Sequence, residues 1–173
     1  MANAFVSPTT RATGYVVTAA NWNADVKTNV DELADFHGVL CPVTAGTTIG
    51  AADTAVLLDA PTFDTDSFAV VAGGHEHFTV PAGMGGYYQI TINLTFAAGA
   101  DTHDVYIKVN NAHVFKSTNT GIAGQVTTVN VTGIYHLAAA DHVDFEAAST
   151  VNRATSNTNG ESFACMHLLN RDG

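Results

Sequence analysis

The clearest pattern in the chain is a strict alternation of apolar and polar residues from Tyr88 to Phe96, within an expected strand over residues 86–97. Every second residue is apolar, and the positions between them carry amides and hydroxyls. Successive side chains of a strand point to opposite faces, so the alternation predicts a half-buried strand of an antiparallel sheet. A strand of a buried parallel sheet would instead be a continuous apolar run. The expected architecture is therefore a sandwich in which each sheet has one buried face and one solvent-exposed face.

Further strand signals recur at short spacing. The expected strands cover residues 54–59, 67–72, 75–80, 86–97, 103–109, 112–117, 125–137, 142–148 and 162–169. Clusters of Gly, Asn and Asp separate them, and Asn110-Asn111 predicts a two-residue hairpin turn. Eight or nine such strands are typical of an all-β jelly roll, expected here over residues 54–173. The apolar phase of the strands predicts these core residues: Phe78, Tyr88, Ile90, Ile92, Leu94, Phe96, Phe145 and Phe163.

The first 53 residues have a different pattern. Residues 1–17 are expected to form an extended arm and residues 18–37 one α-helix with Thr18 as its N-cap. One helix face carries the apolar residues Trp22, Val26, Val30 and Leu33, with Phe36 at its edge. No second helix is expected to cover this face, so the helix is expected to pack on the sandwich, on a symmetry mate or on another protein. Residues 1–37 are the expected region of attachment or trimer contact. Residues 38–53 are rich in small residues and are expected to be a linker.

Amino-acid composition and charge limit the classes of function that the chain can have. Charged residues make up only 13% of the chain, and the net charge of −10 argues against nucleic-acid binding. The N-terminus lacks a secretory signal pattern, and no apolar run is long enough to span a membrane. The protein is therefore expected to be made in the cytoplasm without membrane association. Cys41 and Cys165 belong to no CxxC pair, and both are expected to be free thiols, with Cys165 in the core.

Candidate chemistry is sparse. His75 and His77 share a strand face and are weak candidate metal ligands, because two ligands are too few without a third group. Carboxylates at Asp141, Asp144 and Glu146 resemble a paired-carboxylate site, but alternation on a strand explains them equally well. The chain has no nucleophile-elbow, zinc-protease, phosphate-loop or dinucleotide fingerprint. We therefore expect no enzyme activity and no cofactor.

The strand region resembles the jelly-roll heads of the complement and tumour-necrosis-factor type over about residues 53–170. Four local motifs carry the resemblance: Phe78 and Pro81 before Gly86-Tyr87-Tyr88; Val109-Asn110-Asn111; Leu137, Asp141 and Val143; and Ser162, Phe163, Cys165 and Leu168. The resemblance implies a homotrimer in which the flatter sheet faces pack around a threefold axis.

The stretch TGYVVTAANWNADVKTNVDEL (residues 13–33) is similar to the start of many tailed-bacteriophage virion proteins. Together the two resemblances imply a virion structural protein with arm, helix and trimeric jelly roll. The leading hypothesis is a capsid decoration or cement protein that binds the major capsid protein or another virion protein. The alternative is a tail-associated or fibre-tip protein that binds a host glycan or receptor. A glycan hydrolase is a third hypothesis, without a convincing acid pair.

Overall fold

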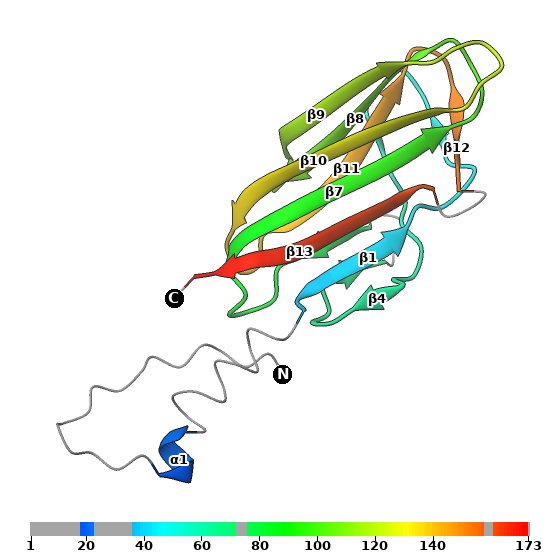
Figure 1. The fold of residues 1–173 in the computed structure, drawn as a ribbon. Helices are drawn as coiled ribbons and strands as arrows, with labels where there is room; N and C mark the ends of the chain where they lie inside the picture. Colours follow the sequence, from blue (N-terminus) through cyan, green and yellow to red (C-terminus); the bar gives the residue numbers. More distant parts are fainter. Residues whose placement is uncertain (1–17, 23–35, 72–75, 158–160, 173) are drawn as a thin grey trace. The chain divides into compact units, whose positions relative to one another are not determined.

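A computed structural model describes residues 18–22, 36–71, 76–157 and 161–172. The chain divides after His37, and Gly38–Asp172 forms one compact unit. This unit is a sandwich of two antiparallel sheets (Figure 1). Before it, the described part of the N-terminal region contains the short helix α1 (Ala19–Trp22).

The larger sheet is centred on β7 (Gly86–Phe96), which pairs on one edge with β10 (Thr127–Leu137). On its other edge the order continues through β13 (Phe163–Arg171), β1 (Gly38–Pro42) and β4 (Phe63–Asp64). The short strands β12 (Arg153–Ser156) and β2 (Thr48–Ile49) extend the sheet beside the end of β7.

The smaller sheet has the order β5 (Ala69–Val70), β6 (His77–Thr79), β11 (His142–Ser149), β8 (Thr102–Val109) and β9 (Ala112–Thr120). The two-residue strand β3 (Thr54–Ala55) also pairs with β11. Each of the nine segments expected from the sequence contains a strand, and the structure adds β1, β2, β4 and β12. The all-β jelly-roll prediction is therefore confirmed.

The core lies between the two sheets. Tyr88, Ile90, Ile92, Leu94 and Phe96 of β7 are fully buried, as their alternation predicts. From the smaller sheet, Phe78 and Phe145 meet edge to face with ring centroids 5.4 Å apart. Aromatic pairs of this geometry add to the stabilisation from burial itself.

Phe163 is not a core residue, so its core prediction is wrong. It pairs with Asn93 of β7, whose side chain faces away from the core, and is only half-buried. The neighbours Ala164 and Met166 are the buried residues of β13. Both phases of FACMHLL are mostly apolar, so alternation could not determine which face turned inward.

The linker expected over residues 38–53 is also wrong. Residues 38–42 form β1, which pairs with β13 and β4. Val39, Cys41 and Val43 are fully buried, and Ile49 of β2 joins them. Such short apolar segments among Gly, Thr and Ala lack the length that makes a strand recognisable. The helix expected over 18–37 is described only at Ala19–Trp22, and residues 36–37 are not helical.

The predicted hairpin turn between β8 and β9 is present. Asn110 and Asn111 have φ values of 49° and 67°, the left-handed conformation that a type I′ turn requires at both central positions. The Asn110 side chain donates a hydrogen bond to Asp141 Oδ1 (2.8 Å) and accepts one from the His142 amide (3.2 Å). These bonds fix the hairpin to the start of β11.

Candidate functional site

The two sheets differ sharply in charge. Strands β1, β7 and β10 contain no Asp, Glu, Lys or Arg, and β13 contains only Arg171 at its last position. Their side chains that face away from the core form what we call the uncharged face. Its members are Leu40, Pro42, Gln89, Thr91, Asn93, Thr128, Asn130, Thr132, Ile134, Phe163, Cys165 and His167.

Hydroxyl pairs cross the uncharged face between β7 and β10. The Thr91 and Thr132 side-chain oxygens lie 3.0 Å apart, and those of Thr95 and Thr128 are also 3.0 Å apart. These polar groups satisfy one another without any ionised partner. The face can therefore be covered by another protein surface without desolvating a charge.

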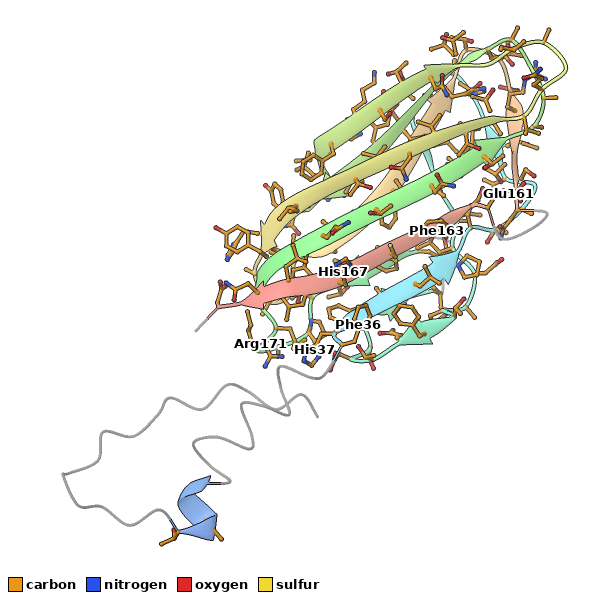
Figure 2. The ribbon with its side chains drawn as sticks, in the orientation of Figure 1. Phe36, His37, Glu161, Phe163, His167 and Arg171 are labelled. Atoms are coloured by element: carbon orange, nitrogen blue, oxygen red, sulfur yellow. The ribbon has the colours of Figure 1, made fainter. Side chains whose placement is uncertain are left out.

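One part of the uncharged face is hollowed. Leu40 and Pro42 of β1, with Thr62, Ser162 and Phe163, line a mostly apolar hollow of about 290 Å³. Figure 2 shows Phe163 and His167 along β13 on this side of the sandwich. Phe63 of β4, which pairs with Leu40, is more than one third exposed. An apolar hollow with exposed aromatic side chains is a suitable seat for a side chain of a partner.

The two cysteines lie on opposite faces of the larger sheet. Leu40 pairs with Cys165 and Cys41 with Ala164, so the thiols sit on neighbouring strands but point apart. Both are free, as expected. Cys41 is fully buried, and burial raises its pKa to about 12. Cys165 belongs to the uncharged face rather than to the core, and burial raises its pKa despite a hydrogen bond with Thr91.

The smaller sheet, in contrast, carries ion pairs on its outward face. Lys108 Nζ lies 2.6 Å from Glu146 Oε1, and Lys116 Nζ lies 3.0 Å from Asp104 Oδ2. Burial of Asp104 opposes its ionisation, but hydrogen bonds from Thr118 and Lys116 outweigh this effect and hold the pKa of Asp104 below its ordinary value. We call this ion-paired outer surface of the smaller sheet the solvated side.

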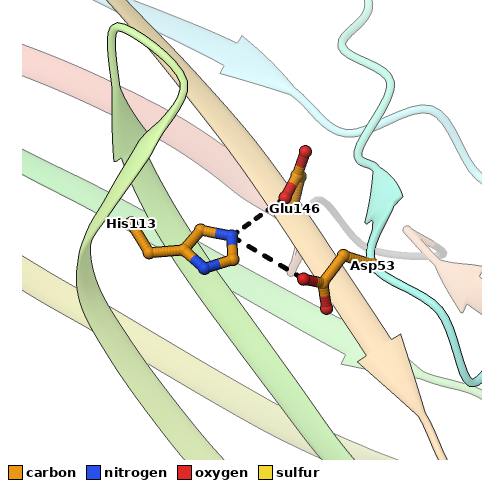
Figure 3. A group of neighbouring side chains, drawn as sticks. All are labelled: Asp53, His113 and Glu146. Carbon is orange, nitrogen blue, oxygen red and sulfur yellow. Dashed lines mark hydrogen bonds and ion pairs between the residues drawn. The ribbon is translucent and has the colours of Figure 1, made fainter.

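Three metal-ligating side chains converge on the solvated side (Figure 3). His113 comes from β9, Glu146 from β11, and Asp53 directly precedes β3. His113 Nε2 lies 3.0 Å from Glu146 Oε2 and 3.8 Å from Asp53 Oδ2, and all three ligand atoms lie within 4.8 Å of one another. We call these residues the His–carboxylate cluster.

Strand pairing explains how the cluster forms. Glu146 pairs with Ala55 on one side and with Tyr106 on the other. Asp53 is two residues before Ala55. The pairing of β8 with β9 shifts register between Ile107 and Lys108, so that His113 lies opposite Lys108. The His113 ring stacks on Tyr106 with centroids 4.3 Å apart, so it reaches across β8 toward β11. The aromatic stack fixes the direction in which the imidazole points.

The electrostatics of the cluster favour an ionised Glu146. Partial burial raises the pKa of Glu146, but hydrogen bonds from Lys108 and His113 outweigh burial and hold the pKa below its usual value. Glu146 is therefore a carboxylate at neutral pH. One oxygen is bound by Lys108 and the other faces His113.

The sequence pointed to other groups. His75 lies outside the described residues, and His77 lies on β6 with its ring 5.7 Å from that of His142, away from the His–carboxylate cluster. No sequence signal linked Asp53, His113 and Glu146, because they are dispersed along the chain and meet only through strand pairing. Of the expected attachment residues, Trp22 ends α1, Phe36 is exposed, and Val26, Val30 and Leu33 lie outside the described residues.

The paired-carboxylate candidate separates into three different environments. Asp141 accepts a 2.8 Å hydrogen bond from the Ala138 amide and so stabilises a turn. Asp144 lies 3.5 Å from His142 Nε2, and Glu146 belongs to the His–carboxylate cluster.

Among the residues that the structure describes, no helix is long and apolar enough to cross a membrane.

Neither a protein-family model nor a curated protein sequence matches the chain. Solved structures do match it. The Eiger tumour necrosis factor of S. frugiperda aligns with a TM-score of 0.61 at 11% identity, over 80% of this chain and 95% of that one. The globular domain of zebrafish complement 1qA protein aligns with a TM-score of 0.59 at 12% identity, over 80% of this chain and all of that one. Murine APRIL at pH 5.0 aligns with a TM-score of 0.57 at 12% identity, over 78% of this chain and all of that one.

At this level of identity the similarity establishes the fold. The two antiparallel sheets and the core between them are those of a β-sandwich. Residues 38–172 therefore form a jelly roll of the kind found in tumour necrosis factor and complement C1q globular domains.

Proposed function

We propose that this protein is a non-enzymatic structural protein that assembles as a homotrimer through the uncharged face. The observation that carries the proposal is the absence of ionisable Asp, Glu, Lys and Arg side chains from β1, β7 and β10, in a chain whose net charge is −10. Self-association of an acidic protein requires a surface where its own charges do not meet. Interface centres are depleted in charged residues for this reason.

Three features of the uncharged face support a contact between identical copies. Its Thr pairs are already hydrogen-bonded, its hollow can receive an apolar side chain, and its member Ile134 on β10 is more than half exposed. A hollow on one part of the face and apolar groups on another favour a head-to-tail contact, which closes into a ring. The jelly-roll fold and its resemblance to trimeric heads favour a ring of three.

Thr132→Arg is expected to dissociate the trimer. Thr132 lies in the middle of β10 on the uncharged face, so each of the three interfaces of the variant ring would have to bury a guanidinium group. Burying a charge without a partner strongly opposes association. Light scattering on the wild-type protein should give three times the mass of one chain, and the variant should give the mass of one chain at the same micromolar concentration.

The matched control is Thr120→Arg. Thr120 is also an exposed strand threonine whose hydroxyl lies 3.0 Å from a threonine across the pair, Thr102, but it lies on the smaller sheet. This variant should remain trimeric. A wild-type monomer, or equal dissociation by both variants, would show that the uncharged face is not the interface.

We further propose that the trimer is a virion protein, specifically a capsid decoration or cement protein attached through residues 1–37. What supports this finer role is the similarity of residues 13–33 to the start of tailed-phage virion proteins. A cement protein stabilises a particle by bridging neighbouring subunits, because binding to the assembled state shifts the equilibrium toward it. Its expected partner is the major capsid protein or another virion protein.

Two measurements on intact particles test this role. Labelling the protein in electron micrographs should place it on the capsid rather than on the tail. Particles stripped of the protein should lose heat stability while they still adsorb to host cells, and adding the protein back should restore stability. Stripped particles that stay heat-stable but no longer adsorb would overturn the cement role.

The alternative is a tail-associated or fibre-tip protein that binds a host glycan or receptor. One observation favours it. Ile122, Val126 and Val151 are each more than half exposed on two loops at one end of the sandwich. Backbone hydrogen bonds from Gly121 to Asp101 and from Thr150 to Thr102 hold these loops together. An exposed aliphatic tip is a possible contact for a receptor, and the stripping experiment distinguishes the two roles.

A further inference from the structure

We propose that Asp53, His113 and Glu146 form a binding site for a divalent transition-metal ion of the zinc class. The inference is independent of the proposed trimer, because these residues lie on the solvated side of the smaller sheet. It goes beyond the sequence pattern, which pointed to His75 and His77.

The spacing of the ligand atoms fits such an ion. Zinc binds imidazole nitrogen and carboxylate oxygen at about 2.0–2.2 Å, so two ligands of one tetrahedral ion lie about 3.3 Å apart. The distances from His113 Nε2 are 3.0 Å to Glu146 Oε2 and 3.8 Å to Asp53 Oδ2, which bracket this value. Small side-chain rotations therefore suffice to bring all three atoms onto one ion.

Two of the three ligands are held by separate structural contacts. Tyr106 stacks under the His113 ring, and Lys108 holds the second oxygen of Glu146, leaving Oε2 directed at His113. Outer contacts that orient ligands in this way are a regular feature of protein metal sites. In Figure 3 the His113 ring points its Nε2 edge between the two carboxylates.

Charge and donor type select the class of ion. Two carboxylates beside one lysine leave the cluster with a net negative charge that a divalent cation offsets. One nitrogen and two carboxylate donors suit zinc, whereas calcium requires six to eight oxygens and magnesium usually retains several waters. His113 and Asp53 are about two-fifths exposed, so water can complete the coordination.

The test is calorimetric titration of the full chain with zinc chloride alone. We expect one saturable site per chain, and we expect calcium and magnesium chloride to give no comparable binding. His113→Gln and Asp53→Asn each remove a proposed ligand. Each should weaken the affinity for zinc by more than ~10–100-fold, which is the loss caused by removing a residue that only contacts a ligand. Cobalt should bind the same site and give the strong visible absorption of a tetrahedral ion, and His113→Gln should remove this absorption.

His136→Gln is the matched control. His136 Nε2 also lies 3.0 Å from a carboxylate, that of Asp172, with similar exposure, but no second carboxylate of the described residues completes a metal-ligating group there. This variant and His77→Gln should bind zinc like the wild type. The proposal is overturned if the wild type shows no saturable zinc binding, if His113→Gln and Asp53→Asn bind zinc normally, or if His136→Gln loses as much affinity as they do. Circular dichroism of each variant shows that a loss of binding is not a loss of folding.

Discussion

Ile92→Asp should lower the free energy of unfolding by more than about 4 kcal/mol, enough to unfold much of the protein. Ile92 lies in the middle of β7 and is fully buried between the two sheets. The new carboxylate would have to remain uncharged or enter an apolar core without a partner, and both are costly. Urea unfolding at one fixed chain concentration measures the loss, because self-association makes stability depend on concentration.

Ile122→Asp makes the same chemical change at a surface position. Ile122 is 64% exposed on the loop between β9 and β10, so the carboxylate there stays in water. Its effect should stay within about 0.5 kcal/mol. Equal losses for the two variants would mean that β7 does not present Ile92 to the core.

Replacing His103 by Leu should remove a pH-dependent loss of stability that the wild type shows below neutral pH. His103 of β8 is fully buried, and its ring stacks on Phe96 with centroids 4.0 Å apart. Neither ring nitrogen has a hydrogen-bond partner among the described residues. Burial lowers the pKa of His103; the nearby Asp101 carboxylate opposes this effect, and Arg153 adds to it.

The direction of the pH effect follows from this lowered pKa. The folded protein keeps His103 neutral, whereas the unfolded chain binds a proton near the ordinary pKa of about 6.5. The stability is fully present above that pH and is lost as the pH falls below it, down to the lowered folded-state pKa. The loss between pH 7 and pH 5 is at most about 2 kcal/mol from this one group.

Urea unfolding of the wild type and of His103→Leu at pH 5, 6 and 7 checks the prediction. The chain has eight histidines, so the relevant quantity is the difference in stability between the two proteins. We expect the variant to gain stability relative to the wild type as the pH falls, while His136→Gln, which changes an exposed histidine, does not. A constant difference across the pH range would show that His103 does not resist protonation in the folded state.

Local sequence patterns are enough to specify the all-β class, the inward face of the long strand and the hairpin turn. Alternation along β7 allows only one face to turn toward the core. A slip of the register by one residue would bury the polar set in place of the apolar set. The polar set is Gln89, Thr91, Asn93 and Thr95, and the apolar set is Tyr88, Ile90, Ile92, Leu94 and Phe96. Asparagine is one of the few residue types that readily adopt the left-handed backbone conformation, and Asn110 and Asn111 adopt it at both central positions of the turn. These are local properties, and local sequence is sufficient to specify them.

Other features depend on pairing between strands that are distant in the chain. Segment 38–42 becomes a strand because β13 and β4 pair with it, and Phe163 turns outward because it lies opposite Asn93. The charge difference between the two sheets depends on which strands share a sheet, and strand pairing sets this. Asp53, His113 and Glu146 come together because β9, β8, β11 and β3 are neighbours in one sheet. Strand pairing is non-local, so no single stretch of sequence contains the information that brings these side chains within reach of one ion.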